Sequence, residues 1–456
     1  MNTHNSFETV PLRRPIEKTT NGTTATQVEE DYTTHRVTRI ETISTGAVDL
    51  EKVGFVGSAE NLRQFALKEG DILFSHINSM SVIGNSAQVP KAVLPLYVGM
   101  NLLRIRPSAS TDPAFLAWCL KSDFIRHQVR QFAKPAINQA SISSANLKRV
   151  RAPLPDLATQ RKIADFLDRE TARIDLLIEK KQRLVALLGE KKSATITNAV
   201  TGGSDKRAIS GDGRVGAEGS RFARPAWASV LPSEWQVMPI KKIVVTPITD
   251  GPHETPEFLD EGVVFISAEA IQDGKIDFDR RRGFISEADN QRYSRKYSPK
   301  TGDIYVVKSG ATTGKSAMVG DNVDFNIWSP LAVIRSKQTM ESRFVLYTIR
   351  SQIVQDAIAV NWSWGTQQNI GMGALGRIQV PVPDIAIQSK IADFLDRETQ
   401  KIDVIQERTN TCIDRLKEYR SALITAAVTG QIDVTTYAKF GTPDHRLEDI
   451  QEEMGA

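Results

Sequence analysis

The stretch Ile-Ala-Asp-Phe-Leu-Asp-Arg-Glu-Thr occurs at Ile163–Thr171 and again, letter for letter, at Ile391–Thr399. The two copies lie 228 residues apart, which is half of the 456-residue length. Nine identical residues do not recur by chance, so the chain consists of two copies of one unit. Any function must therefore be explained for a molecule that carries the same architecture twice.

The match extends beyond this stretch, but its strength is uneven. Pro153–Asp156 corresponds to Pro381–Asp384. Ile196-Thr-Asn-Ala-Val-Thr-Gly202 corresponds to Ile424-Thr-Ala-Ala-Val-Thr-Gly430. The long regions that precede these segments keep only scattered matches. We infer that the matched segments do the same job twice, whereas the variable regions do two related but different jobs.

The matched segments are predicted to form long helices. Apolar residues recur at spacings of three and four from Ile163 to Leu188, with gaps at Glu170 and Lys181, and from Ile391 through Ile405 to Leu423. This spacing is typical of a coiled-coil seam. Each segment begins with an aspartate suited to an N-cap and ends with a glycine suited to a C-cap: Asp156 and Gly202, Asp384 and Gly430. A helix of some 40 residues would be ~60 Å long.

A long helix with one apolar stripe must bury that stripe. Two related stripes in one chain most simply bury each other, in antiparallel orientation, which would place the variable domains at opposite ends of a rod. The alternative is that each helix packs on its own domain. The repeated polar residues suggest one partner surface presented twice, although recent duplication would also explain them. The candidate partner-docking residues are Asp165, Asp168, Arg169, Glu170, Asp393, Asp396, Arg397 and Glu398.

The variable regions are predicted to be mixed α/β domains. Short β-branched runs bounded by turn residues indicate strands at Val98–Ile105, Gly262–Ile266, Asp303–Val307 and Leu331–Ile334. Helices are expected at Pro113–Phe132 and Met340–Val360. The expected fold is α+β, with two such domains joined by two long antiparallel helices in an intramolecular coiled coil with a pseudo-twofold repeat. The expected segments are domain one at 1–152, a central helix at 153–203, a flexible linker at 204–234, domain two at 235–380, a C-terminal helix at 381–430 and an acidic tail at 431–456.

Composition excludes several classes of protein. The hydrophobic fraction of 40% and charged fraction of 25% are ordinary for a globular protein. Two cysteines are too few for a disulfide framework, and six scattered histidines lack metal-ligand spacing, so no metal is expected. No apolar run reaches membrane-spanning length and no signal segment opens the chain, so a cytoplasmic protein is expected. Residues 1–152 carry a net charge of +5, which weakly favours a polyanionic partner.

No catalytic motif is complete. Ser309–Ser316 resembles a phosphate-binding loop, but three residues separate Gly310 from Gly314 where that loop needs four. The stretch is better interpreted as a hairpin whose Lys308, Lys315 and Ser316 face an anion. The Asn/Asp-Pro-Pro-aromatic motif of amino-methyltransferases and the Gly-x-Ser-x-Gly elbow are both absent. We therefore expect a non-enzymatic protein without a cofactor.

The doubled architecture resembles the DNA specificity subunit of type I restriction-modification systems. In that family each variable domain is followed by Pro-x-Pro and a helix with Gln-x-x-Ile-x-x-x-Leu. The matching residues are Pro153, Pro155, Gln160, Ile163 and Leu167, and Pro381, Pro383, Gln388, Ile391 and Leu395; Gln139, Ile142 and Leu147 and their copies also fit. The family commonly has Glu-Gln where this chain has Thr159-Gln160 and Ile387-Gln388, which leaves the contact at the helix start open.

The resemblance implies two target recognition domains, each reading one half of an asymmetric bipartite site in double-stranded DNA. It also implies a helical spacer that docks two methyltransferase subunits, with restriction subunits joining them, so that catalysis belongs to the partners. The main alternative is a two-headed protein scaffold that binds no DNA. A third reading is an ATPase that uses the near-miss loop.

The family cannot supply the base-reading residues, because these vary between its members. By side-chain chemistry the candidates are Ser75, His76, Asn78, Arg104 and Arg106 in the first domain, and Lys308, Lys315, Ser316, Trp362, Trp364, Gln367 and Gln368 in the second. Solvent exposure alone would explain Arg104 and Arg106, and core packing would explain the two tryptophans. Gln139 and Gln367 match between the copies, which favours a shared structural or phosphate-binding role.

Overall fold

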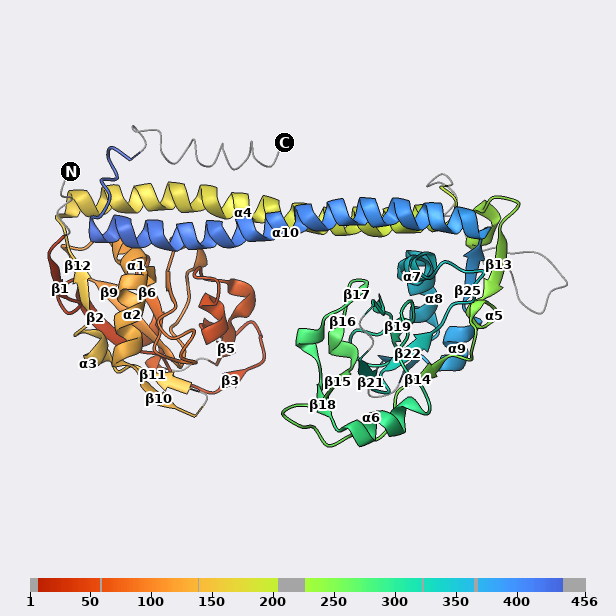
Figure 1. The fold of residues 1–456 in the computed structure, drawn as a ribbon. Helices are drawn as coiled ribbons and strands as arrows, with labels where there is room; N and C mark the ends of the chain where they lie inside the picture. The colour runs from red at the N-terminus through yellow and green to blue at the C-terminus, as the bar shows by residue number, and fades with distance from the viewer. Residues whose placement is uncertain are drawn as a thin grey trace. The chain divides into compact units, whose positions relative to one another are not determined.

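The computed structural model describes residues 7–57, 60–137, 139–203, 226–321, 324–364 and 368–437 (Figure 1). Most of the expected linker and tail, 204–225 and 438–456, lies outside the described residues. The chain divides into two compact units. Unit 1 comprises residues 1–182 and 411–456, and unit 2 comprises residues 183–410. The division passes through both long helices, so each unit contains the first half of one helix and the second half of the other.

The two predicted long helices are present with the expected ends. Helix α4 spans Leu157–Val200 and helix α10 spans Ile385–Thr429. The carboxylate of Asp156 accepts a hydrogen bond from the backbone N–H of Thr159 at 3.0 Å, which caps the first turn of α4. Beyond the last turns, Gly202 and Gly430 adopt φ angles of +83° and +76°, a left-handed conformation that terminates helices and favours glycine.

Within each unit the two helix halves pair in antiparallel orientation. In unit 2, Gln406 donates to the carbonyl of Val185 at 3.2 Å, and Lys192 forms an ion pair with Asp403 at 2.6 Å. Later positions in α4 thus contact earlier positions in α10. In unit 1, Arg420 binds Asp175 through two hydrogen bonds of 2.8 and 3.0 Å, and this pair is the repeat equivalent of Lys192–Asp403. The expected antiparallel pairing is therefore confirmed.

The seam differs from the expectation in its polar positions. Ile405 was assigned to the seam but is 45% exposed, whereas Thr409 is 1% exposed. The hydroxyl of Thr409 donates to the carbonyl of Ile405 at 2.7 Å, so its burial leaves no unsatisfied hydroxyl. Lys181, assigned to a gap, is also buried. An apolar-only ladder missed these positions because threonine and the long stem of lysine can also fill a helix interface.

The variable part of unit 1 is built on an antiparallel sheet with strand order β2-β9-β6-β8. A smaller sheet has the order β10-β11-β7. The elements are β1 Thr9–Pro11, β2 Ile16–Asn21, β3 Gln27–Val28, β4 His35–Val37, η1 Ile40–Ile43, η2 Leu50–Lys52, β5 Gly54–Val56, η3 Glu60–Phe65, β6 Ile72–Ser75, β7 Ile77–Asn78, β8 Ser86–Gln88, η4 Lys91–Val93, β9 Leu102–Pro107, α1 Pro113–Lys121, α2 Asp123–Phe132, β10 Lys134–Ala136, β11 Gln139–Ser141, α3 Ser144–Leu147 and β12 Arg151–Pro153.

Unit 2 repeats this plan with the antiparallel sheet β14-β22-β19-β20 and adds the sheet β18-β15-β21, in which β15 and β21 are parallel. The elements are η6 Ala226–Val230, β13 Gln236–Pro239, α5 Ile240–Ile243, β14 Thr249–Asp250, β15 Val263–Ile266, η7 Ala268–Ala270, β16 Ile271–Gln272, β17 Lys275–Ile276, η8 Phe278–Arg280, β18 Gly283–Ile285, α6 Glu287–Ser294, β19 Ile304–Val307, β20 Ser316–Met318, β21 Phe325–Ile327, β22 Leu331–Ile334, α7 Ser342–Arg350, α8 Gln352–Val360, β23 Ser363–Trp364, β24 Gln368–Asn369, α9 Met372–Arg377 and β25 Gln379–Val382.

Each helix expected in the variable regions is in fact two helices broken at a serine. Ser122 lies between α1 and α2, and its hydroxyl donates to the carbonyl of Cys119 at 2.6 Å. Ser351 lies between α7 and α8 and donates to the carbonyl of Thr348 at 2.5 Å. Continuous apolar periodicity hid the break, because a serine hydroxyl can satisfy a helix-end carbonyl without interrupting the apolar pattern.

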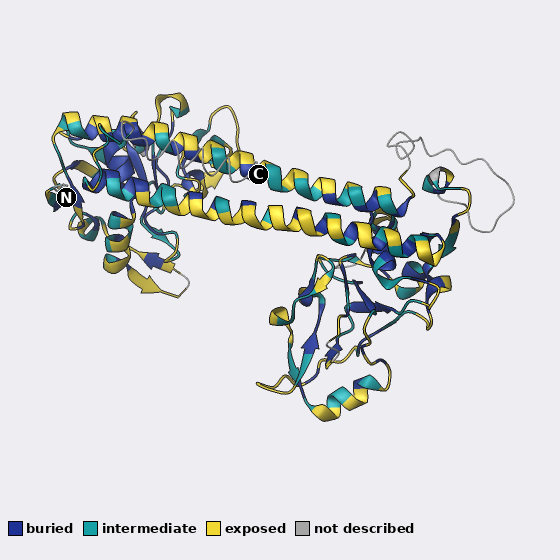
Figure 2. Cartoon of the chain, turned by 45° about the horizontal axis from the view of Figure 1, so that its top comes forward, coloured by how far each residue is buried: buried dark blue, intermediate teal, exposed yellow. Residues whose placement is uncertain are grey.

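In each unit, one of the buried clusters lies where α1 or α7 packs against the long helices, and Figure 2 shows buried residues on the helices at each end of the pair. In unit 1, Phe115 and Trp118 of α1 pack with Ile163 and Leu167 of α4 and with Leu423 of α10. Both expected packing modes therefore occur together: each helix packs on its own domain and on the other helix. Among the described helices, none combines the length and the apolar composition needed to cross a membrane.

Candidate nucleic-acid interface

The near-miss phosphate loop of unit 2 is a hairpin turn. Residues 308–315 join β19 to the antiparallel strand β20, whereas a phosphate-binding loop leads from a strand into a helix. The backbone N–H of Gly310 donates to the carbonyl of Gln368 at 3.0 Å, and that of Ile370 donates to the carbonyl of Lys308 at 2.8 Å. The structure thus confirms the hairpin and brings Lys308 and Gln368 together from distant parts of the sequence.

Beside this hairpin a buried carboxylate gathers three nitrogen groups. Asp250, which is 1% exposed, accepts from Lys296 at 2.5 Å and from His253 at 3.0 Å, and pairs with Lys308 at 3.1 Å. Burial alone would raise the pKa of Asp250, but the hydrogen bonds from the two lysines outweigh it and lower the pKa. Two lysines share one negative charge, so the cluster presents excess positive charge. Next to it lies a cavity of about 480 Å³.

The other candidates of unit 2 are placed unevenly. Lys315 is exposed and Gln368 is half-buried. Ser316 is 3% exposed, so its hydroxyl lies inside the domain rather than facing a ligand. Trp362 is half-buried. The side chain of Trp364 and the whole of Gln367 lie outside the described residues.

A run of three arginines was missed by the sequence reasoning. Arg280 and Arg282 are 63% and 49% exposed, and the guanidinium of Arg281 stacks over the ring of Phe284 at 4.7 Å. Arg282 lies over Trp328 at 5.5 Å. Arg280 also pairs with Asp277 at 3.2 Å and Arg282 with Glu269 at 3.5 Å, so each exposed guanidinium uses only part of its five-donor fork within the chain. The signal is visible in the sequence as three consecutive cations, but a run of charges is also what a solvated surface shows.

In unit 1 the connection from β6 to β8, residues 76–85, corresponds to this hairpin and carries different side chains. Strand β11 of the β10–β11 hairpin pairs with β7, with Ala140 opposite Asn78. Asn78 donates to the hydroxyl of Ser75 at 3.2 Å, but Ser75 itself is fully buried. His76 is half-buried, and burial lowers its pKa. Gln139 is exposed on β11. His76 and Asn78 therefore lie beside β11, on which Gln139 is exposed.

The structure buries Arg104, and it pairs the partly exposed Arg106 with a buried carboxylate. Arg104 is 4% exposed and donates to the carbonyls of Gln64 and Ala66 and to a threonine hydroxyl. Arg106 makes two hydrogen bonds of 2.7 Å to buried Asp71. Buried carboxylates need such a partner. Unit 2 repeats this pair as Arg335 and Asp303, so the arginines serve the shared scaffold.

The start of each long helix is fixed to its domain by a buried glutamine. Gln160 accepts from the backbone N–H of Asp112 at 2.8 Å and donates to the carbonyl of Pro155 at 2.8 Å. Gln388 does the same with Glu341, at 2.9 Å, and with Pro383, at 2.7 Å. This contact explains why glutamine recurs at this point of both copies. A side chain that bonds two backbone segments sets the angle at which the helix leaves the domain.

The repeated polar residues on the helices are partly used within the chain. Asp168 accepts from the indole N–H of Trp118 at 2.8 Å, and Asp396 accepts from the hydroxyl of Tyr347 at 2.7 Å. Asp393 pairs with Arg343 at 2.9 Å. The remaining docking candidates are disposed as follows: Asp165, Arg169 and Arg397 are exposed, Glu170 pairs with Arg173 at 3.6 Å, and Glu398 pairs with Lys401 at 2.8 Å.

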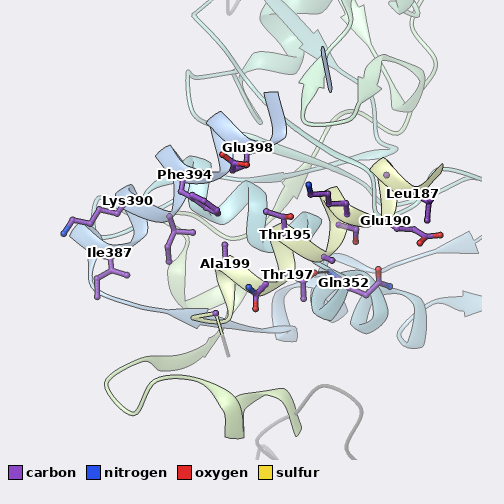
Figure 3. A pocket seen from close by; sticks show the side chains of 17 residues that line it. Leu187, Glu190, Thr195, Thr197, Ala199, Gln352, Ile387, Lys390, Phe394 and Glu398 are labelled. Atoms are coloured by element: carbon purple, nitrogen blue, oxygen red, sulfur yellow. Dashed lines mark hydrogen bonds between the residues drawn. The ribbon is translucent and has the colours of Figure 1, made fainter. Parts of the chain in front are cut away.

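Unit 2 has a groove along its helix pair. A cavity of about 1640 Å³ lies between the second half of α4 and the first half of α10, with Phe394, Lys390 and Glu398 among its lining residues (Figure 3). Phe394 is 42% exposed. Its repeat equivalent in unit 1, Phe166, is 2% exposed because the ring of Tyr437 packs against it with centroids 5.2 Å apart. The same residue is therefore covered in one unit and open in the other.

Comparison with known proteins identifies both repeats. Residues 8–186 and 232–412 match the family described as "Type I restriction modification DNA specificity domain". The chain is 25% identical to a putative type I restriction enzyme MjaX specificity subunit of Methanocaldococcus jannaschii, over 94% of each chain. It is 24% identical to the type I restriction enzyme EcoBI specificity subunit of Escherichia coli, over 64% of this chain and 60% of that protein.

The fold is also shared with a solved structure. A chain from a study of complex assembly and conformational transition of the type I R-M system superposes with a TM-score of 0.64 at 18% identity. The match covers 94% of this chain and 98% of the other. At this level of identity the likeness concerns the fold alone.

Proposed function

Because this chain belongs to the family of type I restriction modification DNA specificity domains, we propose that each of its two units reads one half of a bipartite, asymmetric sequence in double-stranded DNA. The chain is the non-catalytic specificity subunit of a restriction-modification complex. It works in the cytoplasm with two methyltransferase subunits and with restriction subunits, which carry out the chemistry.

One observation supports the recognition of two different half-sites. The two units agree in the contacts that hold their folds together and differ on the surfaces that face a ligand. The pairs Asp71–Arg106 and Asp303–Arg335 repeat between the units. At the hairpins, by contrast, unit 1 offers Asn78 and unit 2 offers a lysine-rich cluster around Asp250. Equivalent frames with unlike polar groups suit the recognition of two different base sequences.

In unit 2 the positive charge around the β19–β20 hairpin supports phosphate contact. Lys315 is exposed there, and Lys308 and Lys296 share a single carboxylate. The arginine run immediately before β18 adds exposed guanidinium groups in the same unit. We propose that Lys315 and the arginine run contact phosphates, whereas His76, Asn78 and Gln368 lie close to base edges.

For the partners we propose the exposed faces of the long helices. Asp165, Arg169 and Arg397 make no intrachain ion pair within 4.0 Å among the described residues, and they recur with the identical stretch. The groove around Phe394 offers unit 2 a partly apolar surface for a methyltransferase subunit, with Lys390 and Glu398 at its sides. Repeated polar residues with one open apolar side chain suit a protein interface.

The proposal is tested by duplex binding of the chain in complex with its methyltransferase partner, measured at several salt concentrations. Affinity should fall with salt, and Lys315→Ala should reduce the slope by about one counterion. The matched control is Lys417→Ala on α10, a lysine that is 57% exposed and paired with Asp414; it should leave the slope unchanged. Binding that is absent or independent of salt would favour the protein scaffold instead.

A further inference from the structure

Unit 2 uses one of its own carboxylates to bridge two cations beside the long helices. The turn Asp273-Gly274 places the carboxylate of Asp273 between the ammonium of Lys192 on α4 and the guanidinium of Arg350 at the end of α7. Lys192 also pairs with Asp403 on α10 at 2.6 Å. Burial raises the pKa of Asp273, but Arg350 and Lys192 more than offset this and keep it ionised. Asp273 therefore fastens the turn to α4 through Lys192 and to α7 through Arg350.

Unit 1 contains the same frame, by which we mean two cations that stand beside a glycine turn next to the long helices. Arg420 stands where unit 2 has Lys192, and it binds Asp175, the equivalent of Asp403. Lys121 is the last residue of α1, as Arg350 is of α7. Each of these two cations also lies over an aromatic ring of its own helix: Lys121 over Trp118 at 4.8 Å, and Arg350 over Tyr347 at 5.7 Å.

The turn itself is repeated as well. Gly46 and Gly274 adopt φ angles of +81° and +90°. Gly274 directly follows Asp273, and Gly46 directly follows Thr45, the repeat equivalent of Asp273. A Cβ atom added to Gly46 would lie 3.8 Å from the Cε atom of Lys121, and one added to Gly274 would lie 2.7 Å from a guanidinium nitrogen of Arg350. The cation therefore stands next to the turn in both units.

The two frames differ in the bridging group. Where unit 2 has Asp273, unit 1 has Thr45. Among the described residues, no carboxylate lies within the 4.0 Å ion-pair distance of the Lys121 ammonium. The nearest acidic groups are committed elsewhere: Asp175 to Arg420, and Asp168 to the indole of Trp118. Burial, together with the like charges of Arg420 and Arg126, lowers the pKa of Lys121 to about 8.

We propose that unit 1 binds one oxyanion, a carboxylate or a phosphate group, between Lys121 and Arg420 at the Thr45–Gly46 turn, in the position that Asp273 occupies in unit 2. The ammonium and the guanidinium donate to the oxyanion, and the exposed Thr45 adds a hydroxyl. The frame holds a single such group, because a single carboxylate fills it in unit 2. A ligand or partner that carries this group thereby distinguishes two units that are otherwise alike at their helices.

The test is thermal unfolding of the full chain with inorganic phosphate titrated at constant ionic strength. The wild type should show saturable stabilisation. Thr45→Asp supplies the missing carboxylate from an exposed position, so it should raise Tm in the absence of phosphate and weaken the phosphate response at least tenfold. The matched control is Asp273→Thr, which opens the same frame in unit 2 and should add a second phosphate response. Acetate in place of phosphate separates recognition of a carboxylate from recognition of a phosphate.

A second readout does not depend on stability. The titration of Lys121, followed by NMR on isotopically methylated lysines, should lie near pH 8 in the wild type without phosphate and move towards 10.5 in Thr45→Asp or when phosphate binds. A wild type that gives no saturable phosphate response, or one that Thr45→Asp leaves unchanged, would overturn the proposal. Because these outcomes involve no DNA, they stand apart from the proposed function.

Discussion

The identical nine-residue stretches place one phenylalanine in two environments, which permits an internally controlled measurement. Phe166→Ala and Phe394→Ala change the same residue within the same flanking letters and on the same kind of helix. Local helix propensity therefore cancels between the two substitutions. Any difference between them reports the tertiary environment alone.

The structure sets the expected magnitudes. Phe166 is 2% exposed, and truncation of a fully buried phenylalanine costs about 3–5 kcal/mol, with a cavity left behind. About 0.5–1.5 kcal/mol of that cost belongs to the edge-to-face contact with Tyr437. Phe394 is 42% exposed on an open groove, so its truncation removes less burial and leaves no closed cavity. With somewhat more than half of the ring buried, we expect the truncation to cost about 1–2 kcal/mol.

The assay must report each unit separately, because a chain with two units need not unfold in one step. Hydrogen exchange read by mass spectrometry in urea meets this need, with peptides from the first half of α4 reporting unit 1 and peptides from the first half of α10 reporting unit 2. The double variant Phe166→Ala with Tyr437→Ala should fall short of additivity by about 0.5–1.5 kcal/mol. Equal losses for the two single variants would refute the reasoning.

Three further outcomes are expected. Asp71→Asn removes the buried charge partner of Arg106 and should destabilise unit 1 by about 3 kcal/mol in urea. The control Asp414→Asn, on the exposed face of α10, should cost under about 1 kcal/mol. Similar losses for the two variants would contradict the structural role of the Asp71–Arg106 pair. Folding lowers the pKa of Asp250, so the stability that its ionised carboxylate contributes is fully present above the ordinary pKa of 3.8 and is lost as pH falls through the lower folded pKa. The difference in Tm between wild type and Asp250→Asn should therefore narrow in that pH range. A difference that stays constant would count against the cluster. Seven residues inserted after both Gln182 and Asn410 preserve the heptad seam and should change the gap between half-sites but not their sequences, as read by methylome sequencing; altered bases within a half-site would exclude a spacer role.

The long helices could be predicted because their signals are local. Each signal involves residues close together in the sequence: apolar spacings of three and four, an aspartate before the first turn and a glycine after the last turn. The exact repeat also exposed the doubling. What failed was the judgement of polar residues on the seam, such as Thr409, since hydrophobicity alone does not record that a hydroxyl can be satisfied by its own helix.

The recognition residues were harder to predict, because their roles depend on contacts between distant segments. Arg104 and Lys308 are both cations near strands, yet one is enclosed by backbone carbonyls and the other pairs with a carboxylate at the rim of a cavity. Nothing in the neighbouring letters separates them. Side-chain type set the candidates, and only the folded chain could show which of them reach the surface.

The exchange of helix halves between the units has a consequence for biosynthesis. Unit 2 is a continuous stretch, residues 183–410, and can close as soon as it leaves the ribosome. Unit 1 is begun first but needs Leu423 and Tyr437 to cover Ile163 and Phe166. Its apolar surface thus stays uncovered until residues beyond 411 have been made, so the unit that is begun first is completed after unit 2, and termination before that point would leave the surface open to aggregation.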